Sequence, residues 1–403
     1  HRIDSMNSHT KTSPQKIVKP YWHRPDNLFR QSLSLLYLSY LSNWKTMPRW
    51  LLKYGIQCLP GAAGSKGMGC IGFPSHPVWE ITTKCNLSCI HCHTSGGIEE
   101  QNELSTEEGK QLLSQLAQIK EFQMMAYTGG EPLVRNDLFE LLAYSKSLGF
   151  SNTLATNAIL VDDGVAEDLK QNGVVIGAVS LDGIDAKTHD QIRMKKGAFQ
   201  QALSGIKSLH DAGIILHINI TAMNYNIDEI YRLLDLVEDL GTGILLMYQL
   251  VPVGRGSAIK DASLDLSSNE RLIKLIAEAQ KRSNAVIEPV AGPQYWAYLL
   301  QQKKISKGFA LKLAEKVFHG CTAGRGFVYI KPNGSVWPCP FIEVNCGNVR
   351  NESFSHIWDN SPVFKKLRNR EKLLKGQCGD CDYKTLCGGC RGRALALTDD
   401  ILE

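Results

Sequence analysis

Between residues 77 and 251, short apolar segments alternate with amphipathic ones, and this alternation constrains the fold more than any other feature. The apolar segments have the length of buried strands, and the segments between them carry apolar residues three and four apart, as helices do. Ser105 and Glu108 form a predicted capping box at the first helix. Repeated strand–helix units imply right-handed crossovers, so we expect an α/β fold with a parallel sheet. The predicted strands are VWEIT, MMAYT, TLAT, VVIGAVSL, ILHINIT and ILLMYQLV, and the predicted helices are 105–120, 136–148, 162–172, 198–212 and 226–240.

The composition is that of a globular protein with more than one domain. The 403 residues are enough for two or three domains, and 43% hydrophobic with 21% charged residues is ordinary. A net charge of +5, without a basic cluster interleaved with aromatic residues, does not predict nucleic-acid binding. We expect an N-terminal helical extension (1–75), the strand–helix core (76–255), a helical connection (256–320) and a compact cysteine-rich unit (321–403).

The N-terminal extension is rich in Leu, Tyr and Trp between residues 28 and 56. Its run LSLLYLSYL is much shorter than the roughly 20 apolar residues that span a bilayer. We favour a pair of helices that packs over the core. The alternative is an amphipathic helix that contacts a membrane surface or a partner protein.

Three of the twelve cysteines, Cys85, Cys89 and Cys92, directly follow the first predicted strand. Three thiolates can hold three irons of a four-iron cubane, which leaves the fourth iron open to a small molecule. The alternative is a zinc site that these cysteines complete with His91 or His93. No secretory signal peptide is recognised before them, and clustered CxxC-type spacings are typical of metal binding in intracellular proteins. We therefore expect a cytoplasmic, oxygen-sensitive protein.

The C-x3-C-x2-C spacing after a strand, with His91 just before the third cysteine, resembles the radical S-adenosylmethionine (SAM) superfamily. The resemblance implies an open, partial (β/α)6 TIM-like barrel, since six units are too few for a closed eightfold barrel. It also implies a [4Fe-4S] cluster that binds SAM, and an electron donor such as ferredoxin or flavodoxin. Cleavage of SAM would give a 5′-deoxyadenosyl radical, which abstracts a hydrogen atom from the substrate. Sites in such barrels lie at the carboxyl ends of the strands.

Residues at or after the ends of five further predicted strands are the candidates for SAM binding. Most are polar residues or glycines; Val251 is apolar, and Arg193 lies in the segment DQIRMKKGAF. Each has a simpler interpretation: a turn or helix cap for the Gly, Asn, Ser and Asp residues, and a solvated surface charge for the arginine. An arginine fork, however, also suits a carboxylate. The resemblance implies that the GGE motif binds the SAM amino group and that the others contact its carboxylate, ribose or adenine. The candidates are Gly129, Gly130, Glu131, Asn157, Ser180, Asp182, Arg193, Thr221 and Val251.

A second group of cysteines lies in the C-terminal unit, where four of them have the spacing C-x2-C-x5-C-x2-C. Taken alone, such pairs also fit one or two zinc-ribbon sites. Beside the first motif, they resemble the SPASM extension, which carries two auxiliary [4Fe-4S] clusters. The resemblance implies one cluster on Cys321, Cys339 and Cys390 and another on Cys378, Cys381 and Cys387.

Two departures from the SPASM pattern concern the remaining ligands. The pattern has a further cysteine after the CGGC segment, which residues 391–403 lack, and Asp399 and Asp400 are the acidic candidates in its place. Cys346 is an extra cysteine that either closes the first auxiliary cluster or is a buried thiol beside the predicted hairpin VYIKPNGSVWPC. We include Cys346 among the candidate metal ligands.

The segments GEPLVRNDLFEL and CGGCRGRA most resemble SPASM enzymes of alternative haem and haem d1 synthesis. We therefore favour a bulky substrate such as a tetrapyrrole or another cofactor precursor, with the auxiliary clusters relaying electrons. The alternatives are a maturase of a ribosomally made peptide or protein and a modifier of a lipid or small metabolite. The alternative that is not an enzyme is a non-catalytic iron–sulfur electron carrier. The intact GGEP and SLDG segments argue against it.

Overall fold

The computed structural model describes residues 76–98, 102–119, 122, 124–317 and 320–403, together with Tyr40 and Asn43. The other residues of the predicted N-terminal extension lie outside the described part of the chain. Lys303 contacts the two described ones: its Nζ donates to Asn43 Oδ1 at 2.6 Å and lies 4.7 Å from the centre of the Tyr40 ring. No helix in the described part has the length and apolarity needed to cross a membrane.

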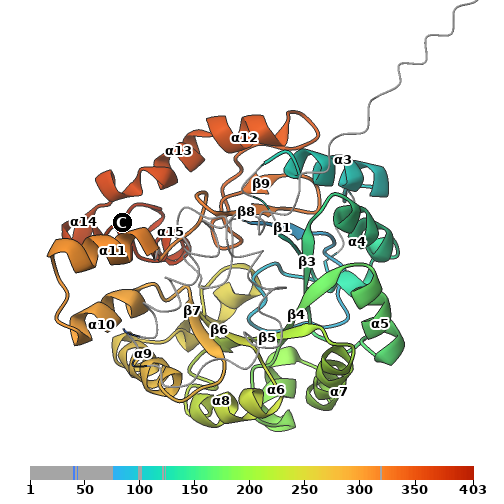
Figure 1. The fold of residues 1–403 in the computed structure, drawn as a ribbon, viewed down its shortest axis with the longest axis horizontal. Helices are drawn as coiled ribbons and strands as arrows, with labels where there is room; N and C mark the ends of the chain where they lie inside the picture. The colour runs from blue at the N-terminus through green and yellow to red at the C-terminus, as the bar shows by residue number, and fades with distance from the viewer. Residues whose placement is uncertain are drawn as a thin grey trace, which may run out of the picture.

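The described residues form one sheet with helices around its outer side (Figure 1). The strand order is β7-β6-β5-β4-β3-β2-β1-β8-β9, and every neighbouring pair except β8–β9 is parallel. The strands are β1 (His76–Glu80), β2 (Met124–Thr128), β3 (Ser151–Thr156), β4 (Val174–Ser180), β5 (Ile215–Ala222), β6 (Ile244–Gln249), β7 (Val286–Val290), β8 (Phe327–Ile330) and β9 (Val336–Trp337). The six predicted strands are β1 to β6, and the predicted α/β fold is confirmed.

The helices bury their apolar faces against the sheet, as the sequence pattern predicts. The predicted capping box is present at α3, where Glu108 N–H donates to Ser105 Oγ and Ser105 N–H donates to the Glu108 carboxylate. The helices are α3 (Thr106–Leu116), α4 (Leu138–Ser147), α5 (Asp163–Gln171), α6 (Ala186–Arg193), α7 (Ala198–Asp211), α8 (Ile230–Asp239), α9 (Leu266–Gln280), α10 (Gln294–Gln302), α11 (Gly308–Val317), α12 (Phe354–Asn360), α13 (Pro362–Arg368), α14 (Gly376–Asp380) and α15 (Arg391–Thr398). Short 3-10 helices are η2 (Pro132–Val134), η3 (Gly254–Ala262) and η4 (Arg370–Lys372).

The predicted helical connection, residues 256–320, also contains strand β7, which the sequence analysis missed. Its sequence VIEPV is short, and Glu288 and Pro289 interrupt the apolar run. The strand nevertheless pairs in parallel with β6 and ends the sheet. Proline is tolerated on an edge strand because its missing N–H is not needed by a second neighbour. The sheet is therefore wider than the predicted six strands.

The cysteine-rich unit is not independent of the sheet. The predicted hairpin is β8–β9, with Gly334 at positive φ in its turn, and β8 pairs in parallel with β1. Helix α12 lies beside α3 and α13 continues along the outside toward α14, while α14 and α15 lie near α11 (Figure 1). The first strand of the C-terminal unit thus belongs to the same sheet as the cysteine loop that follows β1.

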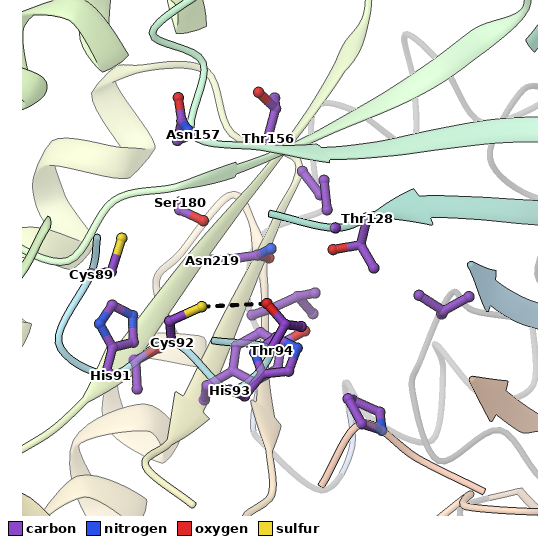
Figure 2. Close-up of a pocket in the computed structure, with 18 of the residues that line it drawn as sticks. Cys89, His91, Cys92, His93, Thr94, Thr128, Thr156, Asn157, Ser180 and Asn219 are labelled. Carbon is purple, nitrogen blue, oxygen red and sulfur yellow. Dashed lines mark hydrogen bonds between the residues drawn. The ribbon is translucent and has the colours of Figure 1, made fainter. Parts of the chain in front are cut away.

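The carboxyl ends of β1 to β6 converge on a cavity of about 270 Å³. Thr128, Ser180 and Asn219 reach it from three of these strands, and Cys89 and Cys92 reach it from the loop after β1 (Figure 2). The cavity lies at the edge of the sheet where the sequence analysis places the site.

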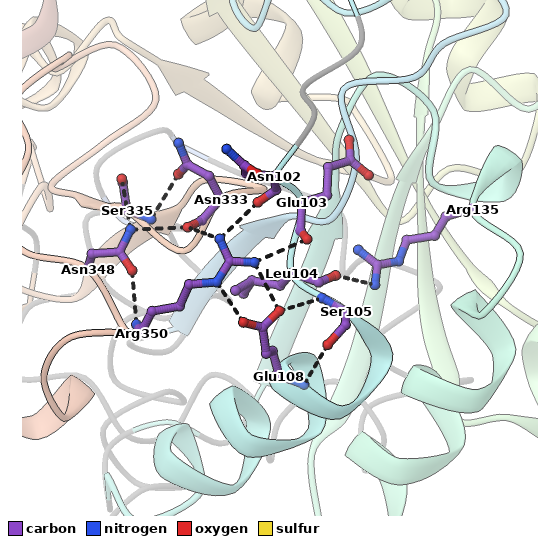
Figure 3. Close-up of polar contacts among 10 residues, drawn as sticks. All are labelled: Asn102, Glu103, Leu104, Ser105, Glu108, Arg135, Asn333, Ser335, Asn348 and Arg350. Atoms are coloured by element: carbon purple, nitrogen blue, oxygen red, sulfur yellow. Dashed lines mark hydrogen bonds and ion pairs between the residues drawn. The ribbon is translucent and has the colours of Figure 1, made fainter.

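Arg350 connects the C-terminal unit to the segment between β1 and α3 (Figure 3). Its guanidinium pairs with both carboxylate oxygens of Glu108, at 2.6 and 2.9 Å, and donates to the carbonyl groups of Asn102 and Glu103. The Glu103 carboxylate in turn accepts from Thr83 N–H at 2.7 Å, two residues before Cys85. Arg350 therefore fixes the segment that supports the start of the cysteine loop.

We expect Arg350→Ala to lower the free energy of unfolding by about 1 kcal/mol, because it removes a bidentate, partly exposed ion pair and three hydrogen bonds to backbone carbonyls. Anaerobic urea unfolding followed by tryptophan fluorescence measures this. The matched control is Arg271→Ala, which removes a more exposed arginine with one contact to Asp228 and should change stability by less than about 0.5 kcal/mol. Equal effects of the two substitutions would contradict the supporting role of Arg350.

Candidate active site

The three thiols of the loop after β1 lie together at one end of the cavity, and each sulfur has an N–H donor. Hydrogen bonds of this kind to sulfur are among the factors that set the properties of iron–sulfur clusters. The donors are Leu87 N–H, 3.4 Å from Cys85 Sγ; Arg193 Nη1, 3.6 Å from Cys89 Sγ; and Gly96 N–H, 3.4 Å from Cys92 Sγ. Thr94 Oγ1 adds a contact with Cys92 Sγ at 3.4 Å (Figure 2).

The electrostatics of these thiols fit a metal cluster that takes up their negative charge. Burial raises the pKa of Cys85 to about 11, and the neighbouring Cys89 and Cys92 add to the shift. Burial also raises the pKa of Cys89, against the attraction of Arg193. Metal ligation removes the thiol protons. In the described residues, no three His, Cys, Asp or Glu side chains gather closely enough to hold a single metal ion, whereas a cubane needs its thiols on separate irons.

Arg255 holds the cysteine loop and was not among the residues expected from the sequence. Its Nε donates to Cys89 O at 2.9 Å, its Nη1 donates to Gly96 O at 2.6 Å, and its N–H donates to Cys92 O at 2.9 Å. Gly254 precedes it with φ of +52°, and a Cβ there would lie 2.5 Å from His93 O. The Gly-Arg pair a few residues after β6 was the available signal, but a sequence does not show which loop an arginine will reach.

The glycines of the GGE motif allow two loops to approach closely. A Cβ on Gly130 would lie 2.2 Å from Lys84 O, and one on Gly129 would lie 2.5 Å from Thr82 O. Gly130 N–H also donates to Thr82 O at 2.8 Å. The nearest neighbours of both glycines are therefore the backbone of the segment that leads into Cys85. This contact gives the motif a role in positioning the cysteine loop, in addition to its place in the cavity wall.

Glu131 lies beneath the cavity wall and does not line the cavity. Its side chain is fully buried and accepts hydrogen bonds from Thr156 Oγ1 and Asn157 N–H, both at 2.8 Å. Burial raises its pKa to about 7, although these donors oppose the shift. The carboxyl group thus joins the end of β2 to the end of β3, and Asn157 in turn donates from Nδ2 to Asn86 in the cysteine loop at 2.7 Å.

Asp182 and Arg193 form a buried ion pair behind the second cysteine. Arg193 Nη2 lies 2.6 Å from Asp182 Oδ2, and Thr221 N–H donates to Asp182 Oδ1 at 2.8 Å. Burial opposes ionisation of Asp182, but Arg193 and His91 hold its pKa below the usual value. Arg193 is therefore not a solvated surface charge: it contacts a protein carboxylate and the Cys89 sulfur at the same time.

The other predicted SAM-binding residues divide between the cavity and the wall behind it. Those that line the cavity are Gly129, Gly130, Asn157, Ser180, Arg193, Thr221 and Val251, whereas Glu131 and Asp182 do not. The inner faces of β5 and β6 contribute lining residues that the sequence analysis did not name: His217, Asn219 and Tyr248. Polar residues at every second position of the apolar strand ILHINIT were the signal that could have found the first two.

The C-terminal cysteines lie in two groups, one around Cys339 and one around Cys387. Burial raises the pKa of Cys339 well above its usual value, with Cys321 and Cys390 adding to the shift. Burial likewise raises the pKa of Cys387 to about 11, with Cys378 and Cys381 adding to it. Cys321 and Cys339 also pack against the same small apolar cluster, whereas Cys381 and Cys387 pack against the main core.

Cys346, Asp399 and Asp400 have surroundings that differ from those of the two cysteine groups. Cys346 Sγ lies 3.6 Å from Val344 O and packs against the main hydrophobic core, whereas Cys321 and Cys339 pack against a separate small cluster. The carboxylate of Asp400 pairs with Lys375 at 2.5 Å, and Asp399 is the left-handed residue that ends α15. The structure does not bring Cys346 to the first auxiliary group.

Comparison with known proteins agrees with this geometry. The Radical SAM superfamily matches residues 79–237, and the SPASM iron–sulfur cluster-binding domain matches residues 321–382. The AdoMet-dependent heme synthase of Methanosarcina barkeri is 38% identical over 330 residues, which cover 81% of this chain and 93% of that protein. Mycofactocin maturase MftC of Mycolicibacterium smegmatis is 29% identical over 320 residues, which cover 77% of this chain and 76% of that protein.

A solved structure shows the same fold. Streptococcus suis SuiB bound to S-adenosylmethionine superimposes with a TM-score of 0.65 at 18% identity and covers 92% of this chain and 85% of its own. The cofactors of the matched domains are SAM, a [4Fe-4S] cluster and auxiliary iron–sulfur clusters. On its sequence matches and its fold, this chain is an enzyme that belongs to the radical SAM superfamily and carries a SPASM domain.

Proposed function

We propose that this radical SAM enzyme acts on a tetrapyrrole or a related cofactor precursor. The observation that carries the proposal is the match to a heme synthase across 93% of that protein's length. The cavity supports it, because Phe327, Tyr329 and Phe341 give it aromatic walls, with Phe341 against His93 of the cysteine loop. Flat aromatic surfaces suit a flat apolar ring. The similarity to a maturase makes a maturation substrate, such as a peptide, the second candidate.

The proposed ligands of the SAM-binding cluster are Cys85, Cys89 and Cys92. When bound, the cluster and SAM supply a radical that abstracts hydrogen from carbon. Arg193 stabilises the Cys89 sulfur and is itself held by Asp182. Asn157, Ser180, Thr221 and Val251 line the cavity at the ends of β3 to β6 and are the proposed contacts for SAM. Gly129, Gly130 and Glu131 position the cysteine loop and the end of β3 around it.

The proposed auxiliary clusters use the two C-terminal groups, with Cys321, Cys339 and Cys390 in one and Cys378, Cys381 and Cys387 in the other. Their proposed role is to pass an electron to or from the substrate. We propose ferredoxin or flavodoxin as the reductant and the cytoplasm as the location, because the expected clusters need a reducing compartment.

The substrate assignment is tested with the reconstituted enzyme, dithionite and SAM under anaerobic conditions. We expect an iron tetrapyrrole that retains its carboxylate side chains to increase formation of 5′-deoxyadenosine and to change mass, as measured by liquid chromatography and mass spectrometry. Equal turnover without the tetrapyrrole, with no change in its mass, would exclude this substrate class and would leave radical SAM chemistry unaffected.

Replacing Cys85, Cys89 and Cys92 together with Ala should abolish 5′-deoxyadenosine formation, because each thiolate holds one iron. Iron on the C-terminal unit should remain, as measured by elemental analysis and Mössbauer spectroscopy. The control is Cys346→Ala, which removes a cysteine that lies apart from the three groups and should keep the activity. Formation of 5′-deoxyadenosine by the triple variant would contradict the proposed ligand set.

Gly130→Ala should weaken the SAM-binding cluster itself, because its methyl group would overlap Lys84 O and displace the cysteine loop. Overlaps of this kind cost about 1–3 kcal/mol, which corresponds to about a 5- to 150-fold loss in the binding equilibrium of the cluster. We expect less iron at the N-terminal site, weaker SAM binding by anaerobic calorimetry and unchanged auxiliary iron. Gly164→Ala is the matched control, since a Cβ there meets only Asp162 Oδ1 at 3.4 Å. A full N-terminal cluster in Gly130→Ala would show that the close approach is dispensable.

A further inference from the structure

Arg370 is a fully buried arginine in the C-terminal unit, at the start of η4. Its carbonyl group accepts hydrogen bonds from Leu373 N–H and Leu374 N–H, both at 2.8 Å, so the backbone fixes its position. Burying an arginine is costly unless its charge and its five N–H groups are matched. The surroundings of this guanidinium therefore indicate what it is there to bind.

The protein itself satisfies only part of this guanidinium. Nη1 donates to the carbonyl oxygen of Cys321. Nε and Nη2 are buried and have no hydrogen-bond partner among the described residues. The adjacent carboxylate, Glu371, pairs with Arg325. The three N–H groups on Nε and Nη2, together with the positive charge, are thus left for a group that the protein atoms do not supply.

The guanidinium lies between the two groups of C-terminal cysteines. A Cβ on Gly388, in the turn between Cys387 and Cys390, would lie 2.5 Å from Arg370 Nε and 2.8 Å from Nη2. Its Nη1 meets the carbonyl group of Cys321, which belongs to the first group. The residue before Cys321 also contacts the residue before Cys387, since Gly320 N–H donates to Leu386 O at 2.6 Å.

We infer that Arg370 is a positioning residue shared by the two auxiliary clusters, to which it supplies a positive charge and N–H donors for their sulfur atoms. The inference rests on the proposed ligand groups. Reduction adds a negative charge to a cluster, so a buried cation and hydrogen bonds to sulfur favour the reduced form and raise the reduction potential. A cation between the two clusters raises both potentials together, so both become easier to reduce while the driving force for electron transfer between them is unchanged.

Arg391 provides a contrast within the same unit. It is also buried, but its Nη1 donates to the carbonyl groups of Ile401 and Glu403, and its Nη2 lies 3.5 Å from Cys378 Sγ. Its contacts with thiols are thus on the side of the second group. We expect its removal to affect mainly the potential of the second cluster, whereas removal of Arg370 affects both.

The test compares the full-length, reconstituted protein with its Arg370→Gln, Arg370→Lys, Arg391→Gln and Lys372→Gln variants. Lys372 is an exposed cation on the same 3-10 turn. Iron is measured first, and about twelve irons per chain are expected for three four-iron clusters. The two auxiliary potentials are then measured by anaerobic redox titration followed by electron paramagnetic resonance.

We expect Arg370→Gln to keep its iron and to lower the ratio of reduced to oxidised protein about tenfold for both auxiliary clusters, which is about 59 mV for a one-electron couple. Arg370→Lys should restore most of the difference, Arg391→Gln should lower mainly one potential, and Lys372→Gln should change neither. If Arg370→Gln instead loses auxiliary iron, we expect Arg370→Lys to keep both clusters. That result supports the inference that one positive charge at this position acts on both clusters.

Three results would overturn the inference: unchanged potentials in Arg370→Gln with full iron, a shift confined to one cluster, or loss of iron from Arg370→Lys as well. A different result would overturn the proposed ligand groups on which it rests. That result is wild-type protein with about four irons and one or two zinc ions per chain, since the auxiliary clusters would then be absent.

Discussion

The whole site depends on the hydrogen bonds that hold the carbonyl groups of the cysteine loop. The loop has no regular secondary structure between Ile81 and Gly97, so it cannot fix three thiols by itself. Arg255 binds three of its carbonyl groups, and Gly130 N–H and Glu131 N–H bind two more at Thr82 and Lys84. Because a cluster tolerates little displacement of its ligands, the precision of the site comes from the ends of β2 and β6 that carry these donors.

A second constraint is the pairing of buried arginines with sulfur. Arg193 contacts Cys89, Arg391 contacts Cys378, and Arg393 lowers the pKa of Cys390 against the effect of burial. Each thiol group is buried deeply enough to penalise negative charge, and each has an arginine that offsets the penalty. The arginines therefore offset part of the free-energy cost of negative charge on these sulfur atoms, whether or not a metal is bound.

Much of this architecture could be predicted because it is local in the sequence. The six strands, the capping box at Ser105 and the β8–β9 hairpin each have a periodicity or a turn motif that a short segment reveals. The division of the C-terminal cysteines followed from their resemblance to a family rather than from their spacing alone. What was missed depends on long-range contacts: β7 is a strand only because β6 offers it an edge, and Arg255 and Arg370 act on segments that are remote in the chain.

The pairing of β8 with β1 connects the cysteine loop to the cysteine group around Cys339. Glu80 ends β1, and its buried carboxylate accepts from Tyr329 Oη at 3.0 Å and pairs with Lys331 Nζ at 2.6 Å. Tyr329 lines the cavity, and its pKa is raised by burial and by Glu80, with Cys92 and Cys339 adding to the shift. Tyr329 on β8 therefore interacts electrostatically with one thiol of the cysteine loop and with one thiol of the group around Cys339. Because β8 is hydrogen-bonded to β1, the separation between those two groups is set by the sheet, and movement of the C-terminal unit relative to the cavity would require that strand pair to break.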